Sequence, residues 1–386
     1  MKLEGVKVID LSMFLPGPHL TMMMADHAAE VIRIEAPGGG EPARHAPYRK
    51  NGHSVWFRNT HRGKKSLRLN LKDERGREIL FKLAAASDVL VEGFRPGVMQ
   101  RLGLGYAALA ARAPQLIVCS ISAFGQTGGY RDKPAHDPAI QAMAGLVSVN
   151  LGRDGRPTLA GVSSADMAGS LMALAGILMA LLRQRQTGQG DYLDIAMNDA
   201  LMAWTPHQTG PVFAEQRDPV PGDERSWGGA AFNNIYDTKD GRAIEFGGVE
   251  HKFGENVLRK AGREDLVPCL HQPYGGPQAP VRDFLREFFG RMTLAEALAW
   301  LEGVECAYAP VRTLSEAFFD PATAERGMLL RDAEGSEHIG VPIKFAREPA
   351  RPEFRLPEYG EHGSEILAAL GYAANEIETL TRDGVI

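Results

Sequence analysis

Residues 6–37 read VKVIDLSMFLPGPHLTMMMADHAAEVIRIEAP, and this stretch decides the fold. Its first seven residues predict a short buried strand, which the turn Pro16-Gly17-Pro18 brings to an end. The segment HLTMMMADHAAE has helical spacing, and EVIRIEAP predicts a second strand. A strand, a helix and a strand in this order are typical of a parallel sheet with crossover helices.

The same order recurs along the first half of the chain. KKSLRLNL predicts a strand, residues 73–86 a helix, and DVLVEGF and LIVCSISAF two more strands. LIVCSIS is a continuous apolar run, of the kind found in strands buried on both faces. An apolar helix and a final strand in GDYLDIAM follow. We therefore predict an α/β domain over residues 1–209.

A change in composition separates this domain from a second one. Residues 210–228 are rich in proline, glycine and charge, which predicts a linker. Next comes FNNIYDTKDGRAIEFGG, in which Asp240-Gly241 predicts the turn of a hairpin. Helical segments and one further strand make residues 229–325 a small α+β domain. Residues 326–386 are expected to return to the large domain as a linker and its C-terminal part.

The composition favours an ordinary globular enzyme or binding protein. The chain has 386 residues, of which 44% are hydrophobic and 24% charged, and a net charge of -5. Such a charge predicts neither nucleic acid nor an anionic membrane as a partner. The three cysteines are widely spaced, so we expect reduced thiols, no metal site and a cytoplasmic location. No signal peptide is visible, and the apolar run 171–182 is too short to span a bilayer, which predicts a buried core helix.

Two residues suggest chemistry. Asp166 stands at the head of the apolar run ADMAGSLMALAGILMALL, where a carboxylate meets the positive end of a helix and free N–H groups. His136 stands at the start of another helical segment, and histidine is a common general acid and base. The two residues could form an acid/base pair, or Asp166 could be a carboxylate nucleophile with a polar neighbour. The alternative is that Asp166 only caps its helix.

Basic residues flank the predicted strands: three precede one strand, Lys72 ends it, and two follow the next, so that Lys72 and Arg95 fall near carboxyl ends. Ligands of parallel α/β sheets bind beyond the carboxyl ends of the strands, so these cations suit an anion with several phosphates. The alternative is a solvated positive face. Gly38-Gly39-Gly40 lacks the spacing of a nucleotide fingerprint and is interpreted as a loop over a ligand. The basic residues are Arg62, Lys64, Lys65, Lys72, Arg95 and Arg101.

With these motifs in order, the chain resembles the class III CoA-transferases, or CaiB/BaiF family, over essentially its whole length. The resemblance implies a large Rossmann-like domain built from both chain ends, a smaller α+β domain and an interlocked, ring-like homodimer. It depends on LEGVKVIDLS, AEVIRIEAPGGGEPAR, RGKKSLRLNLK, SDVLVEGFRPG, LGLGYAAL, SISAFGQTGGY, AHDPAIQAMAGL, SSADMAGSLMALAGILMALL, RQTGQGDYLDIAM, YDTKDGRAIEFGGVEHKF and DPATAERGM.

The resemblance implies a mechanism for Asp166, which matches the family's catalytic aspartate. Its carboxylate would attack an acyl-CoA thioester and form a mixed anhydride and then an aspartyl-CoA thioester, from which an incoming carboxylic acid takes the CoA. Coenzyme A would then be part of the substrate, with no tightly bound cofactor. The CoA contacts would fall on Leu69, Lys72, Gly93, Phe94, Arg95 and Arg101.

Several positions depart from the transferase pattern. Ala36 replaces a basic residue that often contacts CoA, and Phe14-Leu15 replaces a polar pair, which argues against oxalate as the acceptor. His136 and Glu250 match the active site of the family's methylacyl-CoA racemases, where His136 and Asp166 would be the acid/base pair. Three functions stay open: a CoA-transferase, which we favour, a 2-methylacyl-CoA racemase, and a non-catalytic CoA-binding protein.

Overall fold

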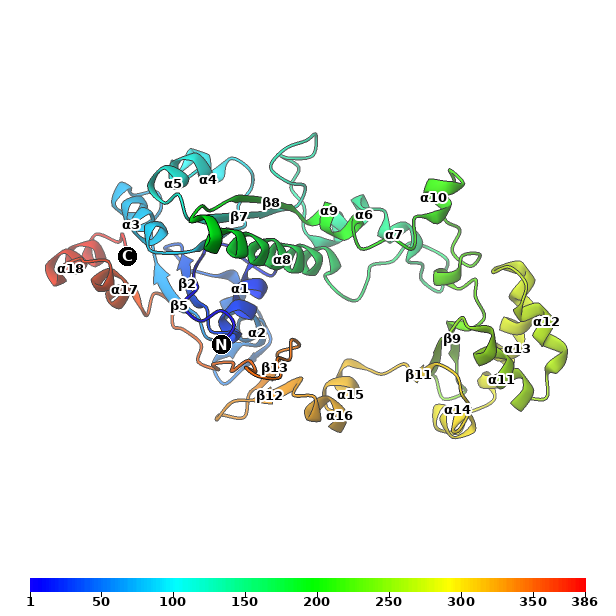
Figure 1. Ribbon diagram of the computed structural model, residues 1–386. Helices are drawn as coiled ribbons and strands as arrows, with labels where there is room; N and C mark the ends of the chain where they lie inside the picture. Colours follow the sequence, from blue (N-terminus) through cyan, green and yellow to red (C-terminus); the bar gives the residue numbers. More distant parts are fainter. The chain divides into compact units, whose positions relative to one another are not determined.

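The computed structural model describes residues 1–386, which divide into two compact units (Figure 1). The first unit comprises residues 1–144, 162–204 and 318–386, and the second comprises residues 145–161 and 205–317. The sequence predicts one continuous large domain over residues 1–209. In the structure, residues 145–161 belong to the second unit instead. An isolated bridge joins Leu151 to Pro157 there, and the side chain of Arg153 donates to Asp237 of the second unit at 2.8 Å. The segment predicted as a linker, 210–228, carries two short helices.

A six-stranded sheet with the order β5-β2-β1-β6-β7-β8 forms the centre of the first unit. All its strand pairs are parallel, so the predicted α/β class is confirmed. The chain builds outward from β1 on one side and from β6 on the other, which puts the topological switch point between these strands. The strands are β1 (Lys7–Asp10), β2 (Glu30–Glu35), β5 (Lys65–Arg68), β6 (Val89–Glu92), β7 (Ile117–Ser122) and β8 (Tyr192–Ala196).

Crossover helices connect these strands, as the sequence predicts. A long loop with the small strands β3 (Arg49–Lys50) and β4 (His53–Ser54) lies between β2 and β5, and its helix was not predicted. The same loop holds the 3₁₀ helix η1 (Pro42–His45). The α-helices up to residue 204 in this unit are α1 (Pro16–Asp26), α2 (Val55–His61), α3 (Glu74–Ala85), α4 (Val98–Arg101), α5 (Tyr106–Arg112), α6 (Asp137–Met143), α8 (Ser164–Thr187) and α9 (Met197–Met202).

The C-terminal segment packs on the first unit. The N–H of Asn70 donates to the carbonyl of Val385 at 2.8 Å, and Ile366 and Leu367 are buried in the same core as Leu67. This segment supplies α16 (Pro321–Glu325), the hairpin of β12 (Leu329–Arg331) and β13 (Glu337–Ile339), α17 (Gly363–Ala369) and α18 (Ala374–Arg382).

Helix α8 is longer than the apolar run that the sequence analysis considered. Its 24 residues are long and apolar enough to cross a membrane, as the core helix of a soluble protein can be, and 44% of its apolar part is buried. One face packs on α1, β7, β8 and α9, and Figure 1 shows α8 running along β7 and β8. The prediction of a buried helix is therefore correct for one face only. Five large apolar residues are exposed: Leu171, Met172, Leu178, Met179 and Leu182.

The second unit has an antiparallel sheet with the order β11-β10-β9, and the predicted hairpin at Asp240-Gly241 is confirmed. The carboxylate of Asp240 accepts a hydrogen bond from the Thr238 hydroxyl at 2.6 Å, which orders the turn. Phe232, Phe246 and Phe289 are buried at its core. Its elements are α7 (Leu146–Val149), α10 (Gly210–Ala214), η2 (Arg225–Trp227), β9 (Asn233–Asp237), β10 (Ala243–Gly247), α11 (His251–Lys260), η3 (Glu264–Leu266), α12 (Val267–Leu270), η4 (Gly276–Gln278), α13 (Ala279–Gly290), α14 (Leu294–Leu301) and β11 (Tyr308–Pro310), with α15 (Leu314–Phe318) at its end.

Candidate active site at the carboxyl edge of the parallel sheet

The topology places Asp166 at the edge of the sheet where ligands bind. Strand β7 ends at this edge, and α8 leads back to the parallel strand β8, so α8 begins at the same edge. The loops after β1 and β6 meet there too, because a Cβ built on Gly93 would lie 3.5 Å from the Cβ of Ser12. The first turn of α8 and the switch-point crevice therefore share one side of the sheet.

Asp137 caps α8. One oxygen of its carboxylate accepts hydrogen bonds from the N–H of Ala165 at 2.7 Å and from the N–H of Asp166 at 3.1 Å. The other oxygen accepts from the side chain of Gln141. The carboxylate of Asp166 accepts no hydrogen bond, so the alternative that Asp166 is merely a helix cap is wrong. The sequence analysis missed this role of Asp137, because the two segments are far apart in the chain.

The surroundings of Asp166 favour its neutral form. Burial and, after it, the like charge of Asp137 raise the pKa of Asp166 from an ordinary value of 3.8 to about 7. A carboxylate of this kind is a stronger base and nucleophile than a solvated one, and it is partly ionised at neutral pH. Asp166 therefore has the properties of a reactive carboxylate, and it has no structural partner that would explain its position.

His136 lies next to this cluster. It is the residue before the first turn of α6, its side chain is exposed, and its neighbour Asp137 bonds to the backbone of Asp166. The ring of His136 contacts Phe14 edge to face, with 5.9 Å between centroids, and Phe14 lies 6.5 Å from Trp56. These three rings form an aromatic group beside the acidic pair.

The backbone of Phe14 has an unusual conformation. Its φ of 66° lies in the left-handed region, which bulky residues seldom adopt and which is often found at functional sites. The N–H of Phe14 donates to the carboxylate of Glu41 at 3.0 Å. Glu41 is itself completely buried and accepts from the guanidinium of Arg33. A buried ion pair thus holds the loop after β1 in the conformation that points Phe14 toward His136.

Three of the predicted phosphate-binding cations have structural partners instead. Lys64 is buried and donates to Asp10 at 3.0 Å; burial alone would raise the pKa of Asp10, but Lys64 and Arg33 hold it at about 2. Because these cations are neutralised by carboxylates, the expectation that they bind a ligand is wrong. The pairs are Lys64 with Asp10, Arg62 with Asp26, and Lys65 with Glu30 and Glu365.

The other three predicted cations are exposed and have no carboxylate partner. We call Lys72, Arg95 and Arg101 the sheet-edge cations. A fourth, Arg131, was missed: a Cβ on Gly97 would lie 3.0 Å from Arg101 and 3.4 Å from Arg131, so the two guanidinium groups flank the same glycine. Their position near the ends of β5 and β6 suits an anionic ligand.

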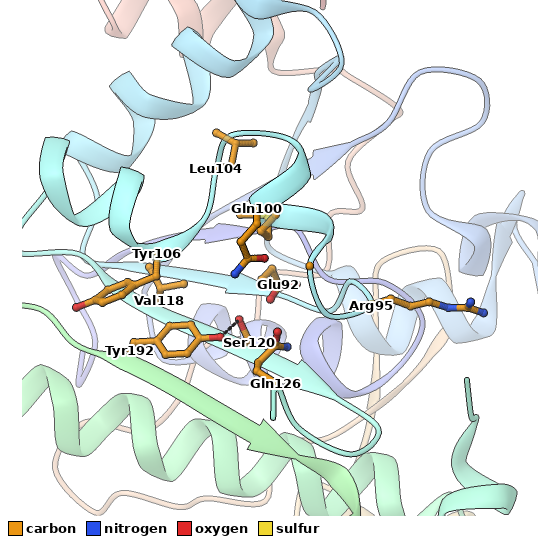
Figure 2. Close-up of a pocket in the computed structure, with 11 residues that line it drawn as sticks. Glu92, Arg95, Gln100, Leu104, Tyr106, Val118, Ser120, Gln126 and Tyr192 are labelled. Carbon is orange, nitrogen blue, oxygen red and sulfur yellow. Dashed lines mark hydrogen bonds between the residues drawn. The ribbon is translucent and has the colours of Figure 1, made fainter. Parts of the chain in front are cut away.

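The three uncharged residues that are predicted to contact CoA differ in their exposure to solvent. Gly93 is exposed and Phe94 is partly buried, whereas Leu69 is 1% exposed and packs in the core. The N–H of Phe94 donates to the buried carboxylate of Glu92 at 2.7 Å, which orders the loop before Arg95. Arg95 also lines a small pocket with Glu92, Ser120 and Tyr192, and Figure 2 shows its side chain extending outward from these residues. Because Leu69 is buried, it can contact a ligand only if the residues around it move.

Glu250 belongs to the second unit. It is exposed at the N-terminus of α11, and its side chain does not cap that helix. Its predicted participation with His136 and Asp166 stays a prediction.

Comparison with known proteins identifies the class of this site. The chain matches the model of CoA-transferase family III over residues 3–363. It is 31% identical over 415 residues to succinyl-CoA:glutarate CoA-transferase of Mus musculus, covering 100% of this chain and 90% of that protein. It is 32% identical over 394 residues to alpha-methylacyl-CoA racemase of Homo sapiens, covering 100% and 98%. A crystal structure of a CaiB/BaiF family protein from Brucella suis superposes with a TM-score of 0.81 at 29% identity, covering 95% of this chain and 99% of that one.

The chain therefore belongs to CoA-transferase family III. It is an enzyme of this class, whose relatives are CoA-transferases with racemases as the close alternative. The resemblance stated from the sequence motifs is confirmed.

Proposed function

We propose that this enzyme transfers CoA between an acyl-CoA and a carboxylic acid through intermediates bound to Asp166. One observation carries the proposal: the Asp166 carboxylate is partly buried and has no hydrogen-bond partner, while Asp137 does the capping. A carboxylate nucleophile needs such a position, because an anhydride intermediate has to be shielded from water.

The proposed reaction has two symmetrical halves. An oxygen of Asp166 bonds to the thioester carbon and expels CoA thiolate, which leaves an acyl-aspartyl anhydride. The thiolate then attacks the aspartyl carbonyl, releases the first carboxylic acid and forms an aspartyl-CoA thioester. The second acid attacks this thioester and expels the thiolate again, which finally attacks the new acyl carbonyl. Asp166 leaves the cycle as a free carboxylate.

The surroundings of Asp166 support an acyl group with apolar carbon. Phe14 and Trp56 are 39% exposed each and lie beside His136, so they present aromatic surface at the site. Such a surface favours an apolar acyl chain over a small dicarboxylate such as oxalate. The sheet-edge cations would pair with the phosphates of CoA, and Arg131 would add a further contact.

We also propose that the enzyme is a cytoplasmic homodimer. The exposed apolar face of α8, from Leu171 to Leu182, is a surface that a second copy of the chain could cover. Met179 and Leu182 are 68% and 71% exposed, so L182E should weaken this association without disturbing the core. Light scattering of the purified protein measures the effect, and a monomeric wild type would contradict the proposal.

Mass spectrometry tests the covalent mechanism. Wild-type enzyme incubated with an acyl-CoA should carry an acyl or CoA adduct on the peptide that contains Asp166, and D166N should carry none. Asp132 is an exposed aspartate without a hydrogen-bond partner, and D132N is therefore the matched control that should keep the adduct. CoA exchange between acids without any adduct at Asp166 would contradict the mechanism.

The second candidate is a 2-methylacyl-CoA racemase, which the position of His136 next to Asp137 favours. A racemase removes and returns the proton at C2, so its wild type would incorporate solvent deuterium there without exchanging CoA between acids. A protein that does neither would be a non-catalytic CoA-binding protein.

A further inference from the structure

His19 is a histidine of the site that neither candidate mechanism uses. It lies in the first turn of α1, and its Nδ1 is 2.9 Å from the hydroxyl of Ser170 on α8. Ser170 follows Asp166 by one helical turn, so both side chains project from the same face of α8. Side chains four residues apart on a helix have their Cβ atoms about 6 Å from each other. The imidazole therefore packs on the face of α8 from which Asp166 projects one turn earlier.

The surroundings of His19 favour its neutral form. Burial, followed by the positive charges of Lys64 and Arg62, lowers the pKa of His19 to about 4, although Asp26 opposes the shift. The imidazole is thus neutral at physiological pH. Lys64 is anchored beside it, since its ammonium group donates to the carbonyl of Pro18 at 2.8 Å.

A neutral imidazole carries one N–H, and the bond to Ser170 indicates where it is. The Ser170 hydroxyl has no other hydrogen-bond acceptor, so its hydrogen is directed to Nδ1 of His19. The proton of the ring is then on Nε2. This nitrogen has no hydrogen-bond partner in the protein and is accessible to solvent. His19 therefore presents a fixed N–H donor on the side of α8 that carries Asp166.

We propose that Nε2–H of His19 donates a hydrogen bond to the carbonyl oxygen of the acyl-CoA thioester while Asp166 attacks it. The inference rests on the proposed function and adds a catalytic residue to it. When the Asp166 oxygen bonds to the carbonyl carbon, the carbonyl electrons move to the oxygen, which becomes an oxyanion. His19 keeps its proton and stabilises this charge until the oxyanion collapses and expels CoA thiolate. A neutral imidazole suits this role, because a pre-organised donor costs no reorganisation during the reaction.

Variants of His19 separate this role from packing. H19F fills the space but lacks the donor, whereas the amide nitrogen of H19Q can take the place of Nε2. We expect H19F to slow the formation of the Asp166 adduct by about 10²–10³-fold, the usual loss for one oxyanion donor. The dissociation constant for CoA should stay near wild type, and H19Q should recover part of the rate. The melting temperature of H19F should fall, because the buried hydroxyl of Ser170 loses its only partner. His271, which is exposed and pairs with Glu255 in the second unit, supplies the control H271A with unchanged rates.

A second measurement does not depend on turnover. In protein labelled with ¹⁵N-histidine, the Nε2 resonance of His19 should shift when the enzyme binds a ketone analogue in which a methylene group replaces the thioester sulfur. Desulfo-CoA, which lacks the acyl carbonyl, should not cause the shift. If wild type forms no adduct but the shift occurs, the proposed function fails and the contact of His19 with substrate stands. A wild-type adduct rate in H19F, or an unmoved resonance at saturating analogue, would overturn the proposal.

Discussion

Replacing the reactive carboxylate should make this enzyme more stable, and the gain should depend on pH. Asp166 is partly buried without a hydrogen-bond partner, and its pKa is raised from 3.8 to about 7 by burial and by Asp137. An acid whose pKa is higher in the folded state loses stability as the pH rises from the unfolded value to the folded value. The isosteric variant D166N is neutral at every pH and escapes this loss.

The size of the gain follows from the shift in pKa. A change of about 3 units at about 1.36 kcal/mol each corresponds to roughly 4 kcal/mol of unfolding free energy near pH 8. Near pH 5 the folded protein holds Asp166 protonated, and the same relation gives D166N a gain of only roughly 2 kcal/mol in unfolding free energy over wild type. For a chain of this length, about 4 kcal/mol raises the melting temperature by roughly 5 °C.

Urea unfolding and calorimetry at both pH values measure this difference. D132N, at an exposed aspartate, should match wild type at both. A D166N variant that is no more stable than wild type would refute the reasoning, and so would a gain that is the same near pH 5 and near pH 8. The first result would show that Asp166 has a stabilising partner when ionised, and the second that its pKa is ordinary.

Three further predictions concern other residues of the candidate site. D137N keeps an oxygen to cap α8 but removes the negative charge beside Asp166, so the pH profile of Asp166 adduct formation should move to lower pH. An unmoved profile would mean that burial alone sets the pKa of Asp166. Replacing the three sheet-edge cations together by glutamine should raise the KM for acyl-CoA and make the KM less dependent on salt. The control R112Q, at an arginine paired with Glu78, should leave the KM unchanged. A wild-type KM in the triple variant would mean that these cations only face solvent. H136A should still form Asp166 adducts if the enzyme is a transferase. In a racemase it should lose deuterium incorporation at C2 by about 10²–10⁴-fold, and that loss without CoA exchange would favour the racemase.

Regular secondary structure could largely be predicted from the sequence. The six strands of the parallel sheet, the hairpin of β9 and β10 and the crossover helices depend on apolar patterns and turn residues within short windows. The small strands β3 and β4 were not predicted. Helix α2 and the hairpin of β12 and β13 were missed, because they are short and lack a clear pattern. The division at residues 145–161 was also missed, since it depends on contacts such as the pair of Arg153 with Asp237, 84 residues apart.

The sequence identified which cations and carboxylates exist but not which of them pair. Arg62 and Lys64 looked like ligand-binding residues from their place beside a strand, yet Asp26 and Asp10 neutralise them in the buried core. Charge pairing in a folded protein is a long-range property, and burial makes a partner obligatory.

The sequence by itself determined the α/β class, the family and the identity of Asp166, because each of these depends on local pattern or on motifs in order along the chain. Only the tertiary structure decided that the carboxylate of Asp166 has no hydrogen-bond partner and a raised pKa. Asp137, 28 residues from Ala165, takes over the capping of α8, and His19 reaches Ser170 across 151 residues. A pKa and a hydrogen-bond direction depend on the groups within a few ångströms, and folding alone brings those groups together.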